Sequence, residues 1–591
     1  MIGLTAGAMR SHENDAGVQR SPIDLVILPD GKRALTANHT AGSVSLIDLD
    51  AGTVLHELPV GKKPSALARS PDGRRAAVSN LWSHSISLLE LANTRLKVIG
   101  RIESVAFPRG LAFSRDGATL YAALAGDDEV VGIDWSSRAL VKRWPAPREP
   151  RQLALSHDGR LLAAASTRSG QVRCWDLDTG KPHWERSIVD GFNLRGLAFT
   201  PDDRFVLCTH IVRREFPVTK DNIEQGWVVD SRVTRLAVRE LPSLTLPARQ
   251  APVSWQIALD VHGQAVGDPH GLAWGHAGKV LAITAGGTHE LLLLDAAAIP
   301  WMAGDPGDFL DPRLQKNNRL RRLALGGRPL TVAFAPKRPH LAVVANYLLD
   351  AVQVVDALAG RVVKTINLGK PTRPSAARRG EAIFHDARRS HHQWFSCHTC
   401  HVDGHTCGLN FDTLNDDSYG NPKLTPSLHN VARTGPWTWH GIQQNLKAAV
   451  HKSLTQTMFG PEPSREDIAD VVAFLETLTP PPHPRPAARA AAVRRGEELF
   501  RGKAGCVRCH RPPLYTSPGN YDVKLGSDGS PHTLWNPPSL LGLYNRGPYL
   551  HDGRARTLDE LLRRHHTPES LRGDALHDKE RSDLIAFLRS L

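Results

Sequence analysis

A short apolar strand, a turn and a second strand recur along residues 21–372, with a period of about 42 to 44 residues. The copies begin at Ser21, Lys63, Pro108, Pro150, Leu194, Pro269 and Arg328. An Asp-Gly turn such as Asp30-Gly31 separates the two strands in several copies, and this dipeptide is typical of β-hairpins. A third and a fourth strand follow most copies, as in SVSLIDLD from Ser43. Four strands per repeat of this length predict an all-β propeller, and seven copies predict seven blades.

Two of the predicted blades carry extra residues, near 213–255 and near 298–325. Long insertions in propellers emerge as loops on one face and often carry function. We therefore expect both insertions to contact the C-terminal part of the chain. The repeats as a whole resemble those of YVTN/WD40-like bacterial propellers, but they do not identify a ligand for the propeller.

Beyond the Pro-rich segment 370–377 the apolar pattern becomes helical, and its landmarks occur twice. RRGEAIFHD from Arg378 matches RRGEELFRG from Arg494, and PSLHNVARTGPWTWHG from Pro426 matches PSLLGLYNRGPYLHDG from Pro538. The C-terminal third is therefore predicted to be a tandem duplication of a mainly α-helical unit.

Both copies of this unit contain the spacing C-x-x-C-H. The first copy supplies Cys397, Cys400 and His401, and the second supplies Cys506, Cys509 and His510. In this motif two thiols bind a haem covalently, and the adjacent histidine ligates the iron. The sequence predicts a di-haem c-type cytochrome with two covalently bound haem c groups.

Two other uses of paired cysteines remain open. A zinc ribbon places its C-x-x-C knuckles roughly 15 to 20 residues apart, whereas these pairs lie in different halves of the duplication. A thioredoxin-like redox pair would need a βαβ context, which neither segment shows. The remaining cysteines, Cys174, Cys208 and Cys407, are expected to be buried thiols.

The predicted units are an N-terminal tail at 1–20, the propeller at 21–372, a first cytochrome c domain at 378–480 and a second at 490–591. The formal net charge of +13 favours acidic partners or anionic surfaces. The basic residues are dispersed without a nucleic-acid motif, so no nucleic-acid partner is predicted. No run approaches the roughly 18 apolar residues of a membrane span.

Haem attachment to this motif normally takes place outside the cytoplasm, which predicts an exported, periplasmic protein. The first residues, MIGLTAGAMRSHENDAG, nevertheless lack the charged n-region and the apolar h-region of a signal peptide. We retain export as the expectation.

The tandem halves, about residues 378–591, resemble bacterial di-haem cytochrome c peroxidases and the related MauG-type enzymes. PYLHDGRARTLDELL, from Pro548, is close to the signature that follows the second haem in that family. The resemblance implies an oxidoreductase in which one haem relays electrons and the other binds hydrogen peroxide. It also implies a redox donor protein or a small electron carrier as partner, and His401 and His510 as the proximal ligands.

The resemblance assigns further positions residue by residue. Trp439 of TWHG matches the tryptophan that lies between the haems, and His440 replaces the family's aspartate. The sixth ligand of the second haem falls on His565, with His566 beside it, where peroxidases have Met and MauG-type proteins have Tyr. Two solvated histidines at a basic helix end are the alternative. The methionines are Met1, Met9, Met302 and Met458, so the second half cannot supply a methionine ligand.

The distal side of the first haem has several candidates: His405, His429, His440, His451 and Met458. His405 follows the proximal histidine on the same loop, so we select it as a possible iron ligand. The family's catalytic Gln and Glu positions fall on Ala449 and near 457–459, which leaves His451 and Glu462 as candidates for proton transfer. Leu424 and Arg546 occupy two of the family's calcium-ligand positions, so calcium is poorly supported.

Three functions are compatible with these residues. The first is a peroxide-using oxidoreductase, of the cytochrome c peroxidase or MauG type, whose propeller binds a substrate or partner. The second is a non-enzymatic di-haem electron-transfer protein with the propeller as a docking module. The third is a propeller binding protein whose haem acts as a sensor. Because a fold does not by itself transfer an activity, the choice depends on the site.

Overall fold

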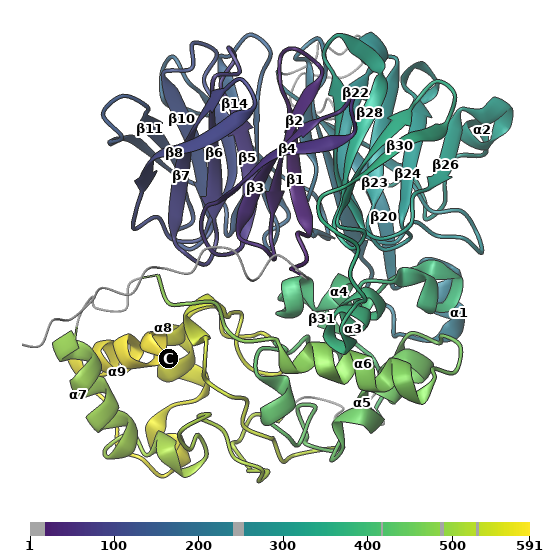
Figure 1. The fold of residues 1–591 in the computed structure, drawn as a ribbon. Helices are drawn as coiled ribbons and strands as arrows, with labels where there is room; N and C mark the ends of the chain where they lie inside the picture. The colour runs from purple at the N-terminus through teal and green to yellow at the C-terminus, as the bar shows by residue number, and fades with distance from the viewer. Residues whose placement is uncertain (1–17, 240–252, 415, 417, 485–489, 527–530) are drawn as a thin grey trace, which may run out of the picture.

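The computed structural model describes residues 18–239, 253–414, 416, 418–484, 490–526 and 531–591. Most of the expected N-terminal tail and part of the first insertion therefore lie outside the described residues. A ring of β-sheets forms the N-terminal part, and a helical region lies against one face of this ring (Figure 1). Within the described residues the ring has seven blades, as the repeat pattern predicts.

The first four blades each contain four consecutive antiparallel strands. Blade 1 contains β1 (Pro22–Ile27), β2 (Arg33–Asn38), β3 (Ser43–Asp48) and β4 (Thr53–Pro59). Blade 2 contains β5 (Pro64–Arg69), β6 (Arg75–Asn80), β7 (Ser85–Ala92) and β8 (Arg95–Ile102). Blade 3 contains β9 (Pro108–Phe113), β10 (Thr119–Leu124), β11 (Glu129–Asp134) and β12 (Leu140–Pro145). Blade 4 contains β13 (Pro150–Leu155), β14 (Leu161–Ser166), β15 (Gln171–Asp176) and β16 (Pro182–Ser187).

Blade 5 departs from this plan, because two short strands, β17 and β18, both pair with β19. It contains β17 (Gly191–Phe192), β18 (Leu197–Phe199), β19 (Phe205–Arg213), β20 (Val229–Ala237), β21 (Ser254–Ala258) and β25 (Met302–Ala303). Blade 6 contains β22 (Pro269–Gly275), β23 (Val280–Ala285), β24 (Glu290–Asp295) and β26 (Leu320–Ala324). Blade 7 contains β27 (Pro329–Ala335), β28 (Arg338–Asn346), β29 (Ala351–Asp356) and β30 (Arg361–Asn367).

The first strand of each blade packs against the first strands of its neighbours, so these strands surround a central channel. The ring closes where β1 packs against β27. Two hydrogen bonds secure this closure: Ser21 N donates to Asp350 Oδ1 over 2.7 Å, and Thr331 Oγ1 donates to Ile23 O over 3.0 Å. The hairpin turns follow the sequence prediction, since Gly31 adopts a φ of 70°, which an L-residue rarely tolerates.

Both insertions contact the helical region, as expected. The first insertion includes α1 (Lys220–Glu224), and Val218 N donates to Asp412 O of the helical region over 2.7 Å. The second insertion includes α2 (Pro312–Gln315) and β25. Its Phe309 ring lies 6.1 Å from the ring of Trp394.

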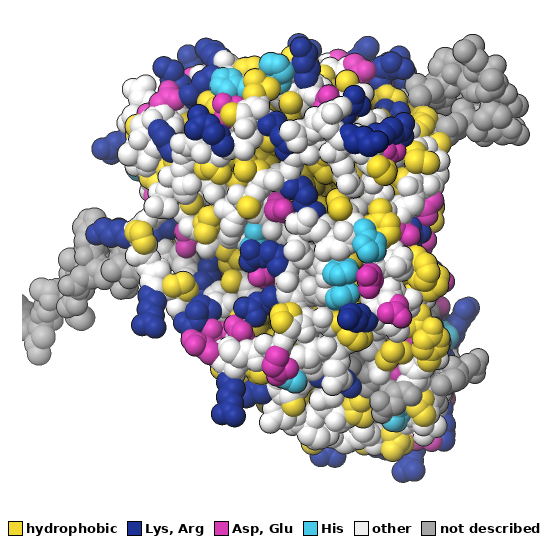
Figure 2. Space-filling model, turned by 90° about the vertical axis from the view of Figure 1, so that its right-hand side faces the viewer, with side chains coloured by type: hydrophobic (Ala, Val, Ile, Leu, Met, Phe, Trp, Pro, Cys, Tyr) yellow, Lys and Arg dark blue, Asp and Glu magenta, His cyan; other side chains and the backbone are white. Residues whose placement is uncertain are grey.

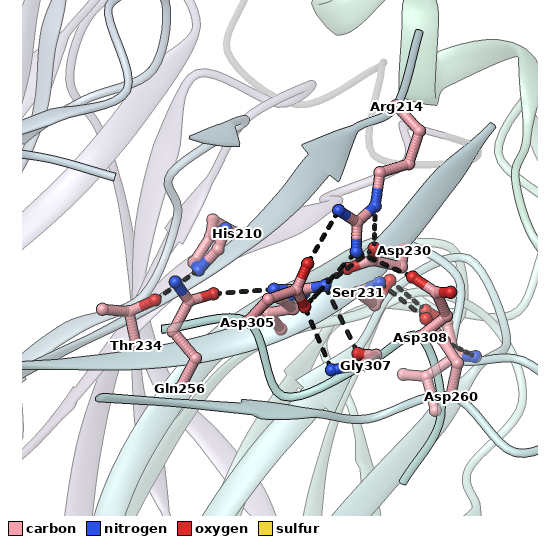
Figure 3. A network of polar contacts seen from close by, with 12 residues as sticks. His210, Arg214, Asp230, Ser231, Thr234, Gln256, Asp260, Asp305, Gly307 and Asp308 are labelled. Atoms are coloured by element: carbon pink, nitrogen blue, oxygen red, sulfur yellow. Dashed lines mark hydrogen bonds and ion pairs between the residues drawn. The ribbon is translucent and has the colours of Figure 1, made fainter. Parts of the chain in front are cut away.

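A partly buried ion-pair network joins the second insertion to blade 5 (Figure 3). Arg214, just after β19, donates to Asp230 over 3.0 Å, to Asp305 over 3.0 Å and to Asp308 over 2.7 Å. Asp230 is completely buried, and Arg232 pairs with it from the same strand. The insertion is therefore fixed against the ring beside the helical region rather than left as a free loop.

The helical region repeats one packing arrangement, in the two halves that the sequence predicts. The first half contains α3 (Ala376–Phe384), α4 (Cys397–Cys400), β31 (Asn410–Phe411), β32 (Lys423–Leu424), α5 (Leu446–Lys452) and α6 (Arg465–Glu476). The second half contains α7 (Ala490–Arg501), α8 (Leu558–Glu560) and α9 (Asp578–Ser590). Helix α3 packs on α6, and α7 packs on α9.

Equivalent residues hold these two helix pairs together. Arg379 binds Asp470 through two hydrogen bonds of 2.6 and 2.7 Å, and Arg495 binds Asp583 through two of 2.7 and 3.0 Å. A glycine follows each arginine, and a Cβ on Gly496 would lie 2.1 Å from Asp583 O. The duplicated R-R-G-E sequence is therefore explained by helix packing.

Helix α4 lies across one end of the propeller channel. Asp268, before β22, accepts hydrogen bonds from Ser396 Oγ over 2.8 Å and from Thr399 Oγ1 over 2.9 Å. The same end of the channel carries Arg195 and Arg328, whose Nη2 atoms lie 3.4 and 3.2 Å from His398 Nε2. The residues between the two cysteines thus face the propeller, and they attach α4 to it.

Basic side chains from equivalent repeat positions meet the first half here. Arg109, Arg151 and Arg195 each stand at the start of a repeat, in PRG, PRQ and LRG. All three pair with Asp403, at 3.3 Å for Arg109 and 3.9 Å for Arg195. The second half has fewer such contacts: Arg148 and Arg168 donate to Gly547 O over 2.9 and 3.0 Å.

Among the described residues, no helix is long and apolar enough to cross a bilayer. On the face drawn in Figure 2, Lys and Arg side chains are scattered, with acidic side chains among them. This distribution agrees with the expectation of a solvated basic surface.

We expect Gly496→Ala to destabilise the second half by about 1–3 kcal/mol, because the added methyl group overpacks the crossing of α7 and α9. Thermal unfolding followed by circular dichroism measures the loss. Gly526→Ala is the matched control, since a Cβ there meets nothing within 4 Å. Equal stability of the two variants would contradict the packing argument.

Stability should also depend on Asp583 at low pH. Its hydrogen bonds from Arg495 lower the pKa of Asp583 to about 2, although desolvation opposes this shift. A depressed pKa stabilises the fold above the ordinary value near 4 and loses that effect as pH falls through about 2. The difference in melting temperature between wild type and Asp583→Asn should therefore be full at neutral pH and shrink between about pH 4 and 2. Asp178→Asn, in an exposed pair with Arg160, should show no such trend.

Candidate haem sites

The first C-x-x-C-H motif is held by its own cap and by the backbone of a neighbouring loop. Ser396 caps α4 in a capping box with Thr399, which places Cys397 and Cys400 at the two ends of one helical turn. His401 follows immediately, and its Nδ1 lies 3.0 Å from Pro426 O. Because this carbonyl can only accept, Nδ1 carries the proton and Nε2 keeps its lone pair for a metal.

The second motif repeats this arrangement. Cys506 begins a short helical turn after Gly505, and His510 Nδ1 lies 3.1 Å from Tyr515 O. Burial lowers the pKa of His401 to about 4 and also lowers that of His510, so both imidazoles are neutral at pH 7. Neutral histidine is the form that ligates iron.

The alternatives to haem attachment receive no support from these positions. All seven cysteines are free. Among the described residues, no group of metal-ligating side chains includes a cysteine, which argues against a zinc knuckle. Cys174, Cys208 and Cys407 are buried thiols, as expected, and burial raises the pKa of Cys174 to about 12.

Aromatic and histidine rings stack between the two motifs. Trp535 stacks on His551 with ring centroids 3.7 Å apart, and on its other side lies 4.3 Å from His440. Trp439 lies 6.4 Å from His551 and donates from Nε1 to Leu424 O over 2.7 Å. Asn536 N donates to Trp439 O over 2.9 Å. We call Trp439, His440, Trp535 and His551 the ring stack.

The ring stack belongs to the segments that anchor the proximal histidines. Leu424 stands two positions before Pro426, whose carbonyl binds His401. Trp535 stands three positions before Pro538, the counterpart of Pro426 in the duplication. The stack therefore connects the surroundings of the two motifs.

The residues present fit two haem groups. Buried nitrogens without hydrogen-bond partners include both ring nitrogens of His551, His440 Nε2, Trp535 Nε1 and His566 Nδ1. Several of these nitrogens belong to the ring stack, and a cofactor bound there would offer them partners that the protein does not supply. The cysteine and histidine donor set is that of haem c.

The structure separates the candidates for the distal side of the first haem. Met458 is buried, and its Sδ lies 3.8 Å from Cys397 Sγ. His405 is buried and stacks on His429 with ring centroids 4.6 Å apart, while its Nδ1 lies 2.7 Å from Ser427 Oγ. His440 belongs to the ring stack instead.

His451 and Glu462 form a pair with each other, with 2.7 Å between Nε2 and Oε1. Their side chains are 40% and 75% exposed, so the pair lies at the surface. A proton-transfer role for this pair stays a prediction, since no contact joins it to either motif histidine among the described residues.

The two candidates on the second haem face different surroundings. His565 Nε2 lies 3.9 Å from Glu560 Oε1 in the π-helical turn Leu561–His565. His566 ends that turn, and burial together with the nearby His510 lowers its pKa to about 4. His566 Nδ1 is buried without a hydrogen-bond partner, whereas His565 pairs with Glu560, so we take His566 forward as a second candidate beside His565, and the choice of sixth ligand stays a prediction.

The family's calcium site is filled by other groups. Arg546 is buried, and its guanidinium donates to the carbonyls of Ser539 and Leu541. A cation at this position would meet a fixed positive charge, and the carbonyls are already occupied. Calcium therefore remains poorly supported.

Residues 374–479 match the family described as di-haem cytochrome c peroxidase. The helical C-terminal region contains a di-haem cytochrome c peroxidase-family domain. This match covers the first copy of the duplication and agrees with the family resemblance, so it supports a di-haem, peroxidase-like redox protein. A family of this kind implies haem c as the cofactor.

Relatives resemble both parts of the chain. The methylamine utilization protein MauG of Methylorubrum extorquens is 27% identical, over 37% of this chain and 79% of the relative. The hydrazine synthase subunit gamma of Kuenenia stuttgartiensis is 24% identical, over 37% of this chain and 79% of that subunit. A solved structure of Kuenenia stuttgartiensis hydrazine synthase covers 59% of this chain and 99% of its own, with 25% identity and a TM-score of 0.52.

Sequence reasoning did not identify Trp535 and His551. His551 had a usable signal: in the duplication PYLHDG aligns with PWTWHG, so His551 is the counterpart of Trp439. Trp535 stands in a segment without a counterpart motif, and nothing in its spacing indicated that it would stack between two histidines.

We expect His566→Ala to open a coordination position on the second haem, converting its ferric low-spin signal to high spin, because the variant removes the sixth ligand. Low-temperature EPR of the ferric protein measures the change. His565→Ala is the matched control and should leave the signal as in wild type. The opposite pattern, with only His565→Ala changing the spin state, would restore the sequence-based choice.

Proposed function

We propose that this protein is an exported di-haem oxidoreductase that uses hydrogen peroxide, with the propeller as the surface for a substrate or redox partner. The observation that carries the proposal is the ring stack between the two haem motifs. Similarity to cytochrome c peroxidases and MauG supports oxidoreductase activity in general terms.

In this proposal Cys397, Cys400 and His401 hold one haem, and Cys506, Cys509 and His510 hold the other. When bound, the haems supply one-electron transfer and an iron position at which peroxide can coordinate. The chain's own residues fix the imidazole orientations through the carbonyls of Pro426 and Tyr515.

The ring stack is proposed to connect the two haems. Trp439, Trp535 and His551 give an almost continuous series of π-systems, with centroid spacings of 6.4 and 3.7 Å between neighbours. The rings are buried or partly buried, and backbone hydrogen bonds hold Trp439 in place. A rigid, water-poor path of this kind favours electron transfer because little reorganisation accompanies it.

Proton transfer at the first haem is assigned to the His451–Glu462 pair in this proposal. Cleavage of the peroxide O–O bond needs a group that moves a proton between the two oxygens, and an imidazole paired to a carboxylate can do so. The exposed position of the pair would connect it to solvent.

The propeller is proposed to have two roles. Its channel end binds α4 through Asp268 and the arginines, so it positions the first haem. The remaining surface is available to a redox donor or a substrate protein. The division into a propeller at 21–372 and cytochrome domains at 378–480 and 490–591 belongs to this proposal, as does export to the periplasm.

A second function is favoured by one specific observation. Met458 is buried against Cys397, and a thioether beside a haem attachment site can serve as a permanent axial ligand. If Met458 and His566 closed both irons, the protein would be a non-enzymatic electron carrier docked through its propeller.

EPR of the half-reduced protein with and without hydrogen peroxide separates these functions. The peroxidase proposal expects one ferric site that is high-spin, or becomes so on half-reduction, and reacts with peroxide. Two low-spin sites that ignore peroxide in every redox state would leave the electron-carrier function.

Trp439→Phe should slow electron transfer between the haems by about tenfold or more, which corresponds to roughly 1.4 kcal/mol in barrier height. Stopped-flow absorption after peroxide addition measures the rate. Trp437→Phe is the matched control: its indole donates to Val431 O over 2.7 Å and lies outside the ring stack. Equal rates in the two variants would remove the stack from the electron path.

A further inference from the structure

One group of metal-ligating side chains among the described residues lies outside both haem motifs. It consists of Glu224, His391 and His392. Glu224 ends α1 in the first propeller insertion, whereas the histidines belong to the turn that precedes α4. Helix α1 packs against that turn, beside the first helical half (Figure 1). The group therefore spans the boundary between propeller and haem region.

The spacing suits one shared ion. One ligand atom from each residue lies within 4.8 Å of the others. His391 Nε2 is 3.7 Å from Glu224 Oε2, too long for a hydrogen bond. Two atoms that each lie about 2.1 Å from a tetrahedral zinc ion are about 3.4 Å apart, so the observed gap is close to that of two ligands on one ion.

Both histidines have a buried nitrogen without a hydrogen-bond partner. These atoms are His391 Nε2 and His392 Nδ1. An unsatisfied buried nitrogen is unfavourable, and a bound ion would give both of these atoms a partner. The two rings stack with centroids 3.9 Å apart, so the nitrogens lie near each other, and one ring must rotate for both lone pairs to point at one ion.

The local charges allow a cation. Glu224 and the two histidines offer one carboxylate and two imidazoles to an ion, and neutral imidazole is the form that binds a metal. Glu224 supplies one negative charge, which offsets the ammonium of Lys220. Two imidazoles and one carboxylate form a borderline donor set, which suits Zn²⁺ better than Ca²⁺ or Mg²⁺.

We propose that Glu224, His391 and His392 bind a divalent transition-metal ion, Zn²⁺ or a similar borderline cation, that joins the propeller insertion to the first haem half. The ion takes two imidazole nitrogens and one carboxylate oxygen and keeps a position for water. This inference does not depend on peroxide chemistry or on electron transfer between the haems.

The site has a direct connection to the first haem motif. His391 N donates to Met458 O over 2.8 Å, and Met458 Sδ lies 3.8 Å from Cys397 Sγ. An ion that fixes His391 therefore also fixes the backbone that carries Met458. Metal binding stabilises the folded state, since an unfolded chain does not hold the three ligands together.

The test is Zn²⁺ binding to the intact haem-loaded protein after chelator treatment. Equilibrium dialysis followed by elemental analysis counts zinc separately from haem iron. We expect one equivalent of tightly bound zinc, a tenfold or greater loss of affinity in Glu224→Gln, and no tight binding in the double variant His391→Ala/His392→Ala. Zinc-edge X-ray absorption of the wild type should show two imidazoles among light-atom ligands.

His157→Ala is the matched control, because His157 is also paired with a carboxylate, Asp203 at 2.7 Å, but has no second imidazole beside it. It should bind zinc as the wild type does. Zinc binding by the wild type that is no tighter than that of Glu224→Gln would overturn the proposal. Glu224→Gln is a conservative change of a partly exposed side chain, so its haem content and circular dichroism should remain those of the wild type. Loss of peroxide reactivity with intact zinc binding would count against the proposed function alone.

Discussion

The arrangement of this protein depends on the contact between helix α4 and the end of the propeller channel. One side of α4 presents Cys397 and Cys400, and the other side presents His398 and Thr399 to the propeller. Asp268 anchors the helix by accepting hydrogen bonds from the hydroxyl groups of Ser396 and Thr399. Both of these hydroxyl residues are buried. The cavity left at this contact is only about 10 Å³, room for at most one water molecule. A single helical turn is thus shared between cofactor attachment and domain docking.

The same contact surrounds the first motif with positive charge. Arg151, Arg195 and Arg328 are buried at the channel end and exceed the negative charge of Asp403. Asp403 keeps 41% of its side chain accessible, so water screens its ion pairs, and their value is orientation more than stability. An excess of fixed positive charge near a haem favours the reduced iron, which has one positive charge fewer. With haem bound as in the proposed function, the propeller would influence the reduction potential of the first haem as well as its position.

Much of this could be read from the sequence because the signals are local. Alternating apolar residues with Asp-Gly turns specify hairpins, and a hairpin repeated at a fixed spacing specifies blades. C-x-x-C-H needs only one helical turn, and the R-R-G-E repeats indicated the duplication, although the close helix crossing at their glycines became visible only in the structure. The positions that escaped prediction depend on contacts between distant segments. The contribution of Trp535 to the ring stack is visible only in the structure, where its ring packs between His440 and His551. The choice between His565 and His566 also depends on the π-helical turn Leu561–His565, which the sequence pattern did not indicate.

The propeller has one channel, whereas the helical region has two similar halves. The two halves therefore cannot make the same contact with the propeller. Only the first half places its haem-attachment helix, α4, over the channel end, where Asp268, Arg195 and Arg328 contact it. The other half meets the rim through Arg148, Arg168 and a stack of Tyr544 on Phe107. The two similar halves therefore lie in unequal surroundings, so equal attachment motifs in them experience different fields, packing and access to solvent.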